Sequence, residues 1–287
     1  MNETKKRQHR FTDHHPYLSG CLFGVLMWLI SGFSSFGINR LIHMAFADYP
    51  IETGPIGIIL GSLLALSVYW FWFRPEFEGH FKGGSVSKGF QAAIPYFAYL
   101  IFSFILDCFF VPGMQFHLIT PHLLFNAIAA GFLEETIFRG GLLTTMMRKR
   151  NDPKRILTAS LISSLIFGLF HLTNISSGGE LLPTIFQTVN AFTTGIVDAM
   201  IYLVSGNILV TIAIHTLHDI IAFSFVQNGS IVSTGPITWE TWLNFALCTA
   251  LGIYAVRMLC EPAIQTHISE VWSKKWNTSD TPDSDAR

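Results

Sequence analysis

Three charged side chains lie within one long apolar stretch of the chain. Glu134, Glu135 and Arg139 fall inside residues 121–147, which we expect to cross a membrane as a helix. Adjacent helical residues point about 100° apart, so the two carboxylates cannot share one task. Glu135 and Arg139 have the i, i+4 spacing at which a carboxylate and a guanidinium meet on one helix face. We therefore predict an ion pair between these two residues and an unpaired Glu134 that faces a polar cavity.

Two later apolar stretches contribute histidines, which act as general acids and bases near neutral pH. His171 lies in residues 156–173, and His215 lies in residues 207–226 together with Asp219. His215 and Asp219 share a helix face because they are four residues apart. An ionised aspartate accepts hydrogen bonds but donates none. We predict that Asp219 accepts from one ring nitrogen of His215, which fixes the tautomer so that the other nitrogen donates to a substrate.

Three further polar residues in apolar stretches have a structural interpretation. A charge at the centre of a membrane costs at least about 2.5 to 3.5 kcal/mol on insertion scales, so each one needs a reason. Asp107 and Asp198 are expected to satisfy the backbone of a neighbouring helix. His218 is turned away from His215 and is expected to pack against another helix.

Groups that react together must lie at one depth in the membrane. At about 1.5 Å per residue, Glu134 and His171 each lie about 21 to 24 Å from the basic turn at residues 148–155. His215 lies only about 12 Å beyond Asn207. Either the helix that carries His215 begins recessed within the protein, or its predicted boundary is misplaced.

Composition sets the class of fold. Half of the 287 residues are hydrophobic and 13% are charged, against about 25% charged residues in an ordinary soluble domain. The net charge of −1 gives no indication of a nucleic-acid partner. A helix needs roughly 20 apolar residues to cross a hydrocarbon core. Such stretches lie near residues 16–38, 55–73, 89–111, 121–147, 156–173, 181–204, 207–226 and 239–260. The predicted fold is all-α, a polytopic membrane protein with about eight transmembrane helices surrounding a polar intramembrane cavity.

The basic residues predict the orientation. With the N-terminus inside, most of the 18 lysines and arginines fall on the cytoplasmic side, as the positive-inside rule requires. We expect an integral protein of the plasma membrane with both termini cytoplasmic. Residues 1–15 are predicted to be a basic cytoplasmic N-terminus, 16–260 a single eight-helix membrane domain with a catalytic core at 121–226, and 261–287 a cytoplasmic polar tail.

Three motifs follow one another on separate predicted helices. They are E-E-x-x-x-R at residues 134–139, F-x-x-x-H at 167–171 and H-x-x-x-D at 215–219. Together with the eight-helix layout they resemble the CPBP family, the group of CAAX proteases and bacteriocin-processing proteins, over about residues 121–226.

The resemblance implies an intramembrane endopeptidase that depends on a glutamate and needs no cofactor. Its substrate would be a membrane-associated or lipid-anchored protein or peptide, either CAAX-like or of the bacteriocin or pheromone type. By this likeness Glu134 and His171 activate a water, while His215 and the residue four positions later stabilise the oxyanion. Prenyl-protein proteases have asparagine at that later position. The aspartate at Asp219 favours the role of orienting His215 over direct donation.

Three alternatives use the same residues differently. Glu134, His171 and His215 could bind a catalytic zinc ion, although the chain has no H-E-x-x-H motif. A proton-coupled transporter would use the intramembrane acids and histidines as a relay, but neither inverted repeats nor paired helix breaks are evident. A non-catalytic immunity or scaffold protein would bind a membrane peptide without cutting it.

Overall fold

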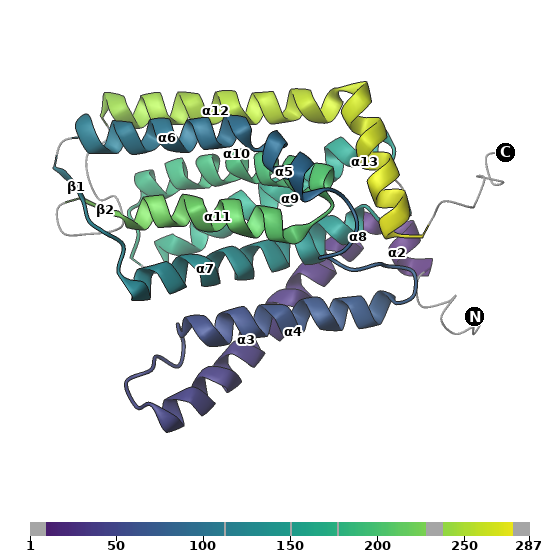
Figure 1. Cartoon of the computed structure of the whole chain (residues 1–287), viewed down its shortest axis with the longest axis horizontal. Coiled ribbons are helices and arrows are strands. Elements are labelled where there is room, and N and C mark those ends of the chain that lie inside the picture. The colour runs from purple at the N-terminus through teal and green to yellow at the C-terminus, as the bar shows by residue number, and fades with distance from the viewer. Residues whose placement is uncertain (1–9, 112, 150, 177, 228–237, 278–287) are drawn as a thin grey trace.

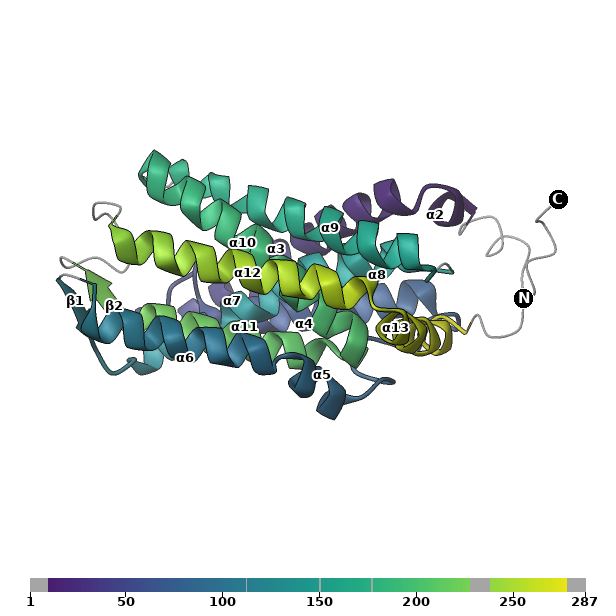
Figure 2. The same cartoon turned by 90° about the horizontal axis from the view of Figure 1, so that it is seen from above.

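The computed structural model describes residues 10–111, 113–149, 151–176, 178–227 and 238–277. Its helices are α2 (Arg10–His14), α3 (Pro16–Ala45), α4 (Pro55–Phe73), α5 (Val86–Ala92), α6 (Ile94–Phe109), α7 (Pro121–Glu135), η1 (Thr136–Leu143), α8 (Thr144–Met146), α9 (Pro153–Phe170), η2 (His171–Ile175), α10 (Leu181–Ser205), α11 (Ile208–Phe223), α12 (Trp239–Cys260) and α13 (Pro262–Lys275). Most of the long helices lie side by side, and the α3–α4 pair lies along one flank of the bundle (Figures 1 and 2). Within the described ranges, β1 (Met114–Phe116) and β2 (Phe225–Gln227) form one short antiparallel sheet. The predicted all-α membrane fold is confirmed.

Capping residues set the ends of the helices that carry the motifs. The side chains of Thr120 and Asp152 accept hydrogen bonds from the first turns of α7 and α9. α10 ends at Gly206, whose φ of 62° is a left-handed conformation that glycine adopts easily. The side chain of Asn207 then caps the first turn of α11. A tight turn therefore joins α10 to α11.

The helices differ in whether they are long enough to cross a membrane. Each of the eight predicted spans overlaps a helix, but in the described residues only five helices are both long and apolar enough to cross: α3, α4, α9 with η2, α10 and α12. A sixth is added if α5 and α6, which are bent by 49° at their junction, count as one span. α11 is apolar but has only 16 residues, and α7 has 15 before its winding changes. The predicted count of eight is not established.

The segment predicted to be a polar tail, residues 261–287, begins with a helix in the structure. Residues 262–275 form α13, in which Ile268, Trp272 and Lys275 are fully buried. The Trp272 indole N–H donates to the carbonyl of Leu203 at 3.0 Å, so the helix docks on the end of α10. The sequence did not indicate this helix, because the apolar residues of its buried face are interspersed with polar residues along the chain. Residues 278–287, the first nine residues of the predicted basic N-terminus (1–15) and Arg150 lie outside the described residues.

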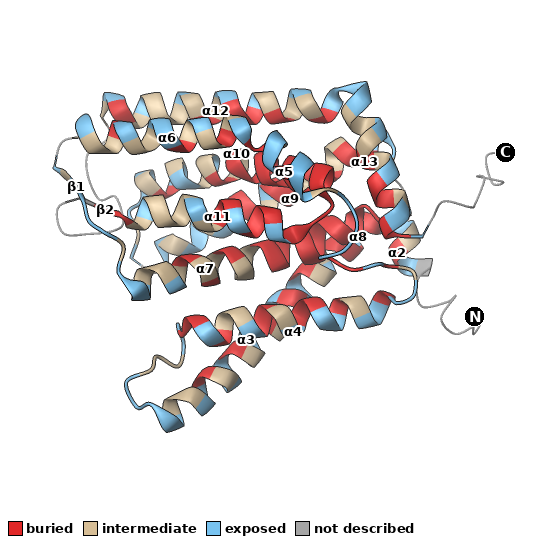
Figure 3. Ribbon diagram, viewed as in Figure 1, coloured by how far each residue is buried: buried red, intermediate tan, exposed pale blue. Residues whose placement is uncertain are grey.

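The two ends of the bundle differ in packing (Figure 3). We call the end formed by α2, α8, α13 and residues 74–85 the packed end, and the end that carries β1 and β2 the sheet end. Every residue of α10 from Thr193 to Ser205 is buried, whereas its first half is mostly partly or fully exposed. All of η1 and α8 is buried as well. The site described below lies where the packed half begins.

The packed end also covers the start of α11. The Asn207 amide donates to the carbonyl of Phe81 at 3.0 Å, and the Ile208 N–H donates to the carbonyl of His80 at 3.1 Å. Asn207 and Ile208 are both buried. The helix that carries His215 therefore begins recessed within the protein, which accounts for its short distance from the turn.

Candidate active site

The helix that carries the charged motif changes its winding at the motif. α7 ends at Glu135 and continues without a break as η1, a π-helical segment that holds Arg139. π-Helical turns are rare and occur frequently at functional sites. Gly140 and Gly141 let neighbouring helices approach this segment. A Cβ atom on either glycine would lie 2.7 Å from a side-chain carbon of α4 or α3, respectively. The α3–α4 pair therefore packs directly against the segment that holds Arg139.

Side chains from two helices also support the backbone of η1. The Thr144 hydroxyl donates to the carbonyl of Arg139 at 2.7 Å. Because this uses the only hydroxyl proton of Thr144, the Tyr202 hydroxyl donates to Thr144 at 2.8 Å. Both residues are fully buried. The carbonyl of Arg139 is thus satisfied in spite of the unusual winding.

Arg139 is buried and is surrounded by acceptors. Its Nη1 donates to Glu135 Oε1 at 2.9 Å, which confirms the predicted ion pair. Its Nη2 donates to the carbonyl of Gly195 at 3.1 Å and lies 3.5 Å from Asp198 Oδ2. The ring of Phe167 covers the guanidinium, with its centroid 4.8 Å from Cζ. Residues from α7, α9 and α10 together fix this one side chain.

His215 lies next to this pair and is held by Glu135. The Nδ1 atom lies 2.9 Å from Glu135 Oε1, the same oxygen that Arg139 binds. Because a carboxylate only accepts, Nδ1 carries the proton and donates it. Glu135, and not Asp219 as the sequence suggested, is the carboxylate that fixes the tautomer. The reason is that Glu135 faces α11 as well as Arg139.

The other nitrogen of His215 faces two acids. Nε2 lies 3.5 Å from Glu134 Oε2 and 3.7 Å from Asp219 Oδ2. Both distances exceed that of a good hydrogen bond but allow strong electrostatic attraction. The side chains of Glu134 and Asp219 are 22% and 19% exposed, whereas that of Glu135 is fully buried. Glu134 is thus neither unpaired nor fully enclosed, and it is the more accessible of the two adjacent glutamates.

His171 is oriented by its own helix. Its Nδ1 donates to the carbonyl of Phe167 at 3.0 Å, which leaves Nε2 as the atom that can accept a proton. The Phe167 ring meets the rings of His171 and His215 edge to face, at centroid distances of 5.0 and 6.0 Å. No ion pair within 4.0 Å joins Glu134 to His171 in the described part of the chain. The two residues that the motifs suggested as joint water activators therefore form no ion pair with each other, although the Phe167 ring contacts both His171 and His215.

The three residues with a structural interpretation have different surroundings. His218 Nδ1 lies 2.8 Å from the hydroxyl of Tyr96 on α6, so the predicted packing against another helix is confirmed. Asp198 faces the guanidinium of Arg139 instead of a neighbouring backbone. Asp107 is half-buried on α6, about three helical turns beyond Tyr96.

One group of side chains could approach a metal ion. Ligand atoms of Glu135, Asp198 and His215 all lie within 4.8 Å of one another. This set shares only His215 with the zinc ligands suggested by the sequence. The Arg139 guanidinium already lies against both carboxylates of the set. Its positive charge occupies the place that a divalent cation would take, so the donor set fits a metal poorly.

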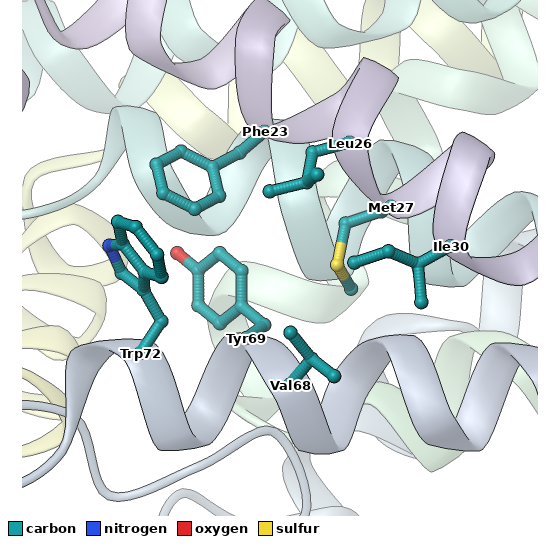
Figure 4. Close-up of a pocket in the computed structure, with 7 residues that line it drawn as sticks. All are labelled: Phe23, Leu26, Met27, Ile30, Val68, Tyr69 and Trp72. Atoms are coloured by element: carbon teal, nitrogen blue, oxygen red, sulfur yellow. The ribbon is translucent and has the colours of Figure 1, made fainter.

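A small pocket lies between α3 and α4, and none of the residues of the cluster lines it. Phe23, Leu26, Met27 and Ile30 of α3 face Val68, Tyr69 and Trp72 of α4 (Figure 4). Its empty volume is about 210 Å³, part of which is open to the surroundings. The Tyr69 hydroxyl is the main polar group in the lining, and it bonds to Thr145. The pocket lacks the groups that hydrolysis requires.

Two members of the cluster were not among the predicted site residues. Asp198 gave a signal, since it is a charge in an apolar stretch, but the sequence cannot show that it meets Arg139. Phe167 is the first residue of the F-x-x-x-H motif, and it contacts Arg139, His171 and His215 at once. Its place in the motif was the available signal.

The residues of this cluster lie within a segment of the chain that matches a known family. Residues 116–221 match the family of type II CAAX prenyl endopeptidases described as Rce1-like. The match includes every motif residue from Glu134 to Asp219. No curated protein matches the chain. Residues 116–221 are thus similar to the CAAX-protease class of membrane proteins, and within that class to the Rce1-like endopeptidases. The chain is an integral membrane protein.

Proposed function

We propose that the chain is a glutamate-dependent intramembrane endopeptidase that needs no metal ion. The observation that carries the proposal is the meeting of Glu134 and His215 from separate helices, with Nε2 and Oε2 3.5 Å apart, beside the partly exposed Asp219. The Rce1-like match over the same residues supports it.

In the first step, Glu134 acts as the general base. Water attacks the carbonyl carbon of the peptide bond and gives its proton to the Glu134 carboxylate. The electron pair of the C=O π bond moves to the oxygen, which becomes an oxyanion. Nε2 of His171 accepts a hydrogen bond from the same water and orients it, because its Nδ1 is already bonded to the Phe167 carbonyl. General bases of this kind contribute about 10² to 10⁴ in rate.

In the second step, the intermediate collapses. The carbon–nitrogen bond breaks and the proton held by Glu134 passes to the leaving amine. His215 stabilises the oxyanion through an Nε2–H donor, which requires a protonated ring. The negative charge for that form comes from Glu135 on one side, and from Glu134 and Asp219 on the other. Removing one such donor typically lowers the rate by about 100- to 1,000-fold.

The proposed substrate is a peptide or protein held at the membrane, such as a lipid-anchored chain. Many large apolar side chains face outward on α3, α4 and α6, which suits contact with lipid. We also propose that both termini are cytoplasmic and that the protein resides in the plasma membrane. The excess of basic residues on that side of the predicted topology supports this orientation.

The test compares membrane peptides from cells that carry the wild-type chain, Glu134→Gln or His171→Ala. Mass spectrometry should find a cleaved peptide in the wild type, reduced by about 100- to 10,000-fold in both variants. Glu240→Gln is the matched control, because it makes the same change at a buried glutamate of α12. Purified wild-type protein should cleave the same peptide at an unchanged rate in the presence of a chelator. Normal cleavage by Glu134→Gln would remove the hydrolase assignment.

A further inference from the structure

We propose that Asp198 is a positioning residue of this active site, which acts on His215 through Arg139 and Glu135. The inference rests on the proposed peptidase function and deepens it. Asp198 lies on α10, in a stretch that carries none of the three motifs. It would give this chain a fourth helix with a defined part in the chemistry.

The first step is that α10 holds one end of Arg139. Nη2 of Arg139 donates to the carbonyl of Gly195 and lies 3.5 Å from Asp198 Oδ2. Nη1, at the other end of the guanidinium, donates to Glu135. The planar fork of the guanidinium links the two contacts rigidly, so a displacement at Asp198 is felt at Glu135.

The second step is that a single oxygen of Glu135 accepts hydrogen bonds from two cationic partners. Arg139 Nη1 and His215 Nδ1 both lie 2.9 Å from Glu135 Oε1. In a buried site these charges interact strongly. The negative charge of Asp198 balances part of the guanidinium charge. Glu135 therefore keeps enough negative charge to hold the Nδ1–H of His215.

The third step is that packing alone gives no reason for a carboxylate here. Asp198 is 2% exposed, and its Oδ1 has no hydrogen-bond partner among the described residues. A buried polar atom left unsatisfied is destabilising. A neutral side chain of the same size would fill the space, so the position requires the charge and not only the volume.

The first experiment measures cleavage by purified Asp198→Asn, which keeps the size of the side chain and removes the charge. We expect kcat to fall by about 10- to 100-fold, the usual range for residues that orient a reacting group, with KM changed less than about twofold. Asp107→Asn is the matched control, since it makes the same change on α6 outside the cluster. Equal kcat for Asp198→Asn and the control would overturn the proposal.

The second experiment asks whether Asp198 acts through Glu135. In a Glu135→Gln background, adding Asp198→Asn should change kcat by less than about twofold, because coupled residues are not additive. A full additional loss in that background would mean that Asp198 acts by some other route and would also overturn the proposal.

The third experiment does not depend on activity. The ¹⁵N spectrum of histidine-labelled protein reports the Nδ1 of His215, assigned by its disappearance in His215→Gln. We expect this signal to move in Asp198→Asn and to stay unchanged in Asp107→Asn. An unmoved signal would overturn the proposal even if cleavage fell. If the signal moves in Asp198→Asn but the wild-type protein cleaves no peptide, the positioning role is supported and only the peptidase function is rejected.

Discussion

Two buried arginines stand close together in the chain, and their surroundings differ. Arg139 in η1 pairs with Glu135 and Asp198, whose side chains are at most 3% exposed. Arg148, just beyond α8, pairs with Asp13 and Glu76, whose side chains are each 25% exposed. Both guanidinium groups are themselves buried.

The partners of the two arginines also contact different parts of the molecule. The partners of Arg139 continue to His215 and then to Glu134 and Asp219. Arg148 joins α2 to residue 76, and its guanidinium lies over the rings of Phe73 and Trp276. The first cluster connects a charge to reactive groups, whereas the second fastens separate segments at the packed end. The burial of an ion pair does not by itself indicate a function. The residues that its members contact show whether the pair belongs to a reactive site or to the packing of the fold.

The largest expected effect is the difference between substitutions of the two arginines. Arg139→Met should abolish cleavage and lower the free energy of unfolding by about 3 to 5 kcal/mol, because buried Asp198 loses the cation it faces and Glu135 keeps only His215. Arg148→Met should lower it by only about 1.5 to 3 kcal/mol, since its carboxylates reach solvent, and should leave kcat of the folded protein unchanged. Thermal unfolding measures the loss of stability in each variant, and kcat measures the loss of cleavage. A folded Arg148→Met protein without activity would break the distinction.

An intermediate effect is expected at Asp219, which faces Nε2 of His215. Asp219→Ala should lower kcat by about 10- to 100-fold, because one of the charges that support the protonated ring is lost. Asp219→Asn should retain more activity than Asp219→Ala, since it keeps a polar group at the same place. Steady-state cleavage by the wild type and both variants measures the order. Equal rates for all three would remove Asp219 from the site.

The smallest effect concerns another buried cation at the packed end, Lys275. Its Nζ donates to the carbonyls of Gly79 and Lys82 at 2.7 and 2.8 Å. Burial lowers the pKa of the Lys275 ammonium from 10.5 to about 7, while the nearby Glu78 opposes this shift. Between about pH 7 and 10.5 the unfolded chain therefore binds more protons than the folded protein. The contribution of Lys275 to stability accordingly rises with pH across that window.

Thermal unfolding at pH 7 and pH 9 tests this contribution. From pH 7 to pH 9 the melting temperature of the wild type should rise by a few degrees more than that of Lys275→Met. A change of 1 kcal/mol in the free energy of unfolding corresponds to about 2 to 4 °C. Lys274→Met, which changes the exposed neighbouring lysine, should follow the wild type. An equal change in melting temperature between pH 7 and pH 9 in the wild type and in Lys275→Met would contradict the lowered pKa of Lys275.

Local spacing and composition predicted part of this molecule well. The pair of Glu135 and Arg139 follows from helical geometry alone, as does the turning of His218 away from the site. The apolar stretches predicted the helices because a membrane imposes length and hydrophobicity on each of them.

Contacts between helices could not be predicted from spacing. Nothing in the sequence places Asp198 beside Arg139, or makes Glu135 the partner of His215 instead of Asp219. These pairings depend on how α7, α10 and α11 rotate against one another. The docking of α13 through Trp272 escaped prediction for the same reason. The π-helical winding of η1 also has no local sequence signature, since it is supported by distant residues such as Tyr202.

The short spacing of Glu135 and Arg139 has a consequence for biosynthesis. A ribosome makes η1 about sixty residues before Asp198 and about eighty before His215, so the charges of the motif enter the bilayer while α10 and α11 do not yet exist. The guanidinium then has its counter-ion one turn away on the same helix, and the two charges insert as a nearly neutral unit. The later helices need only join a pair that is already formed.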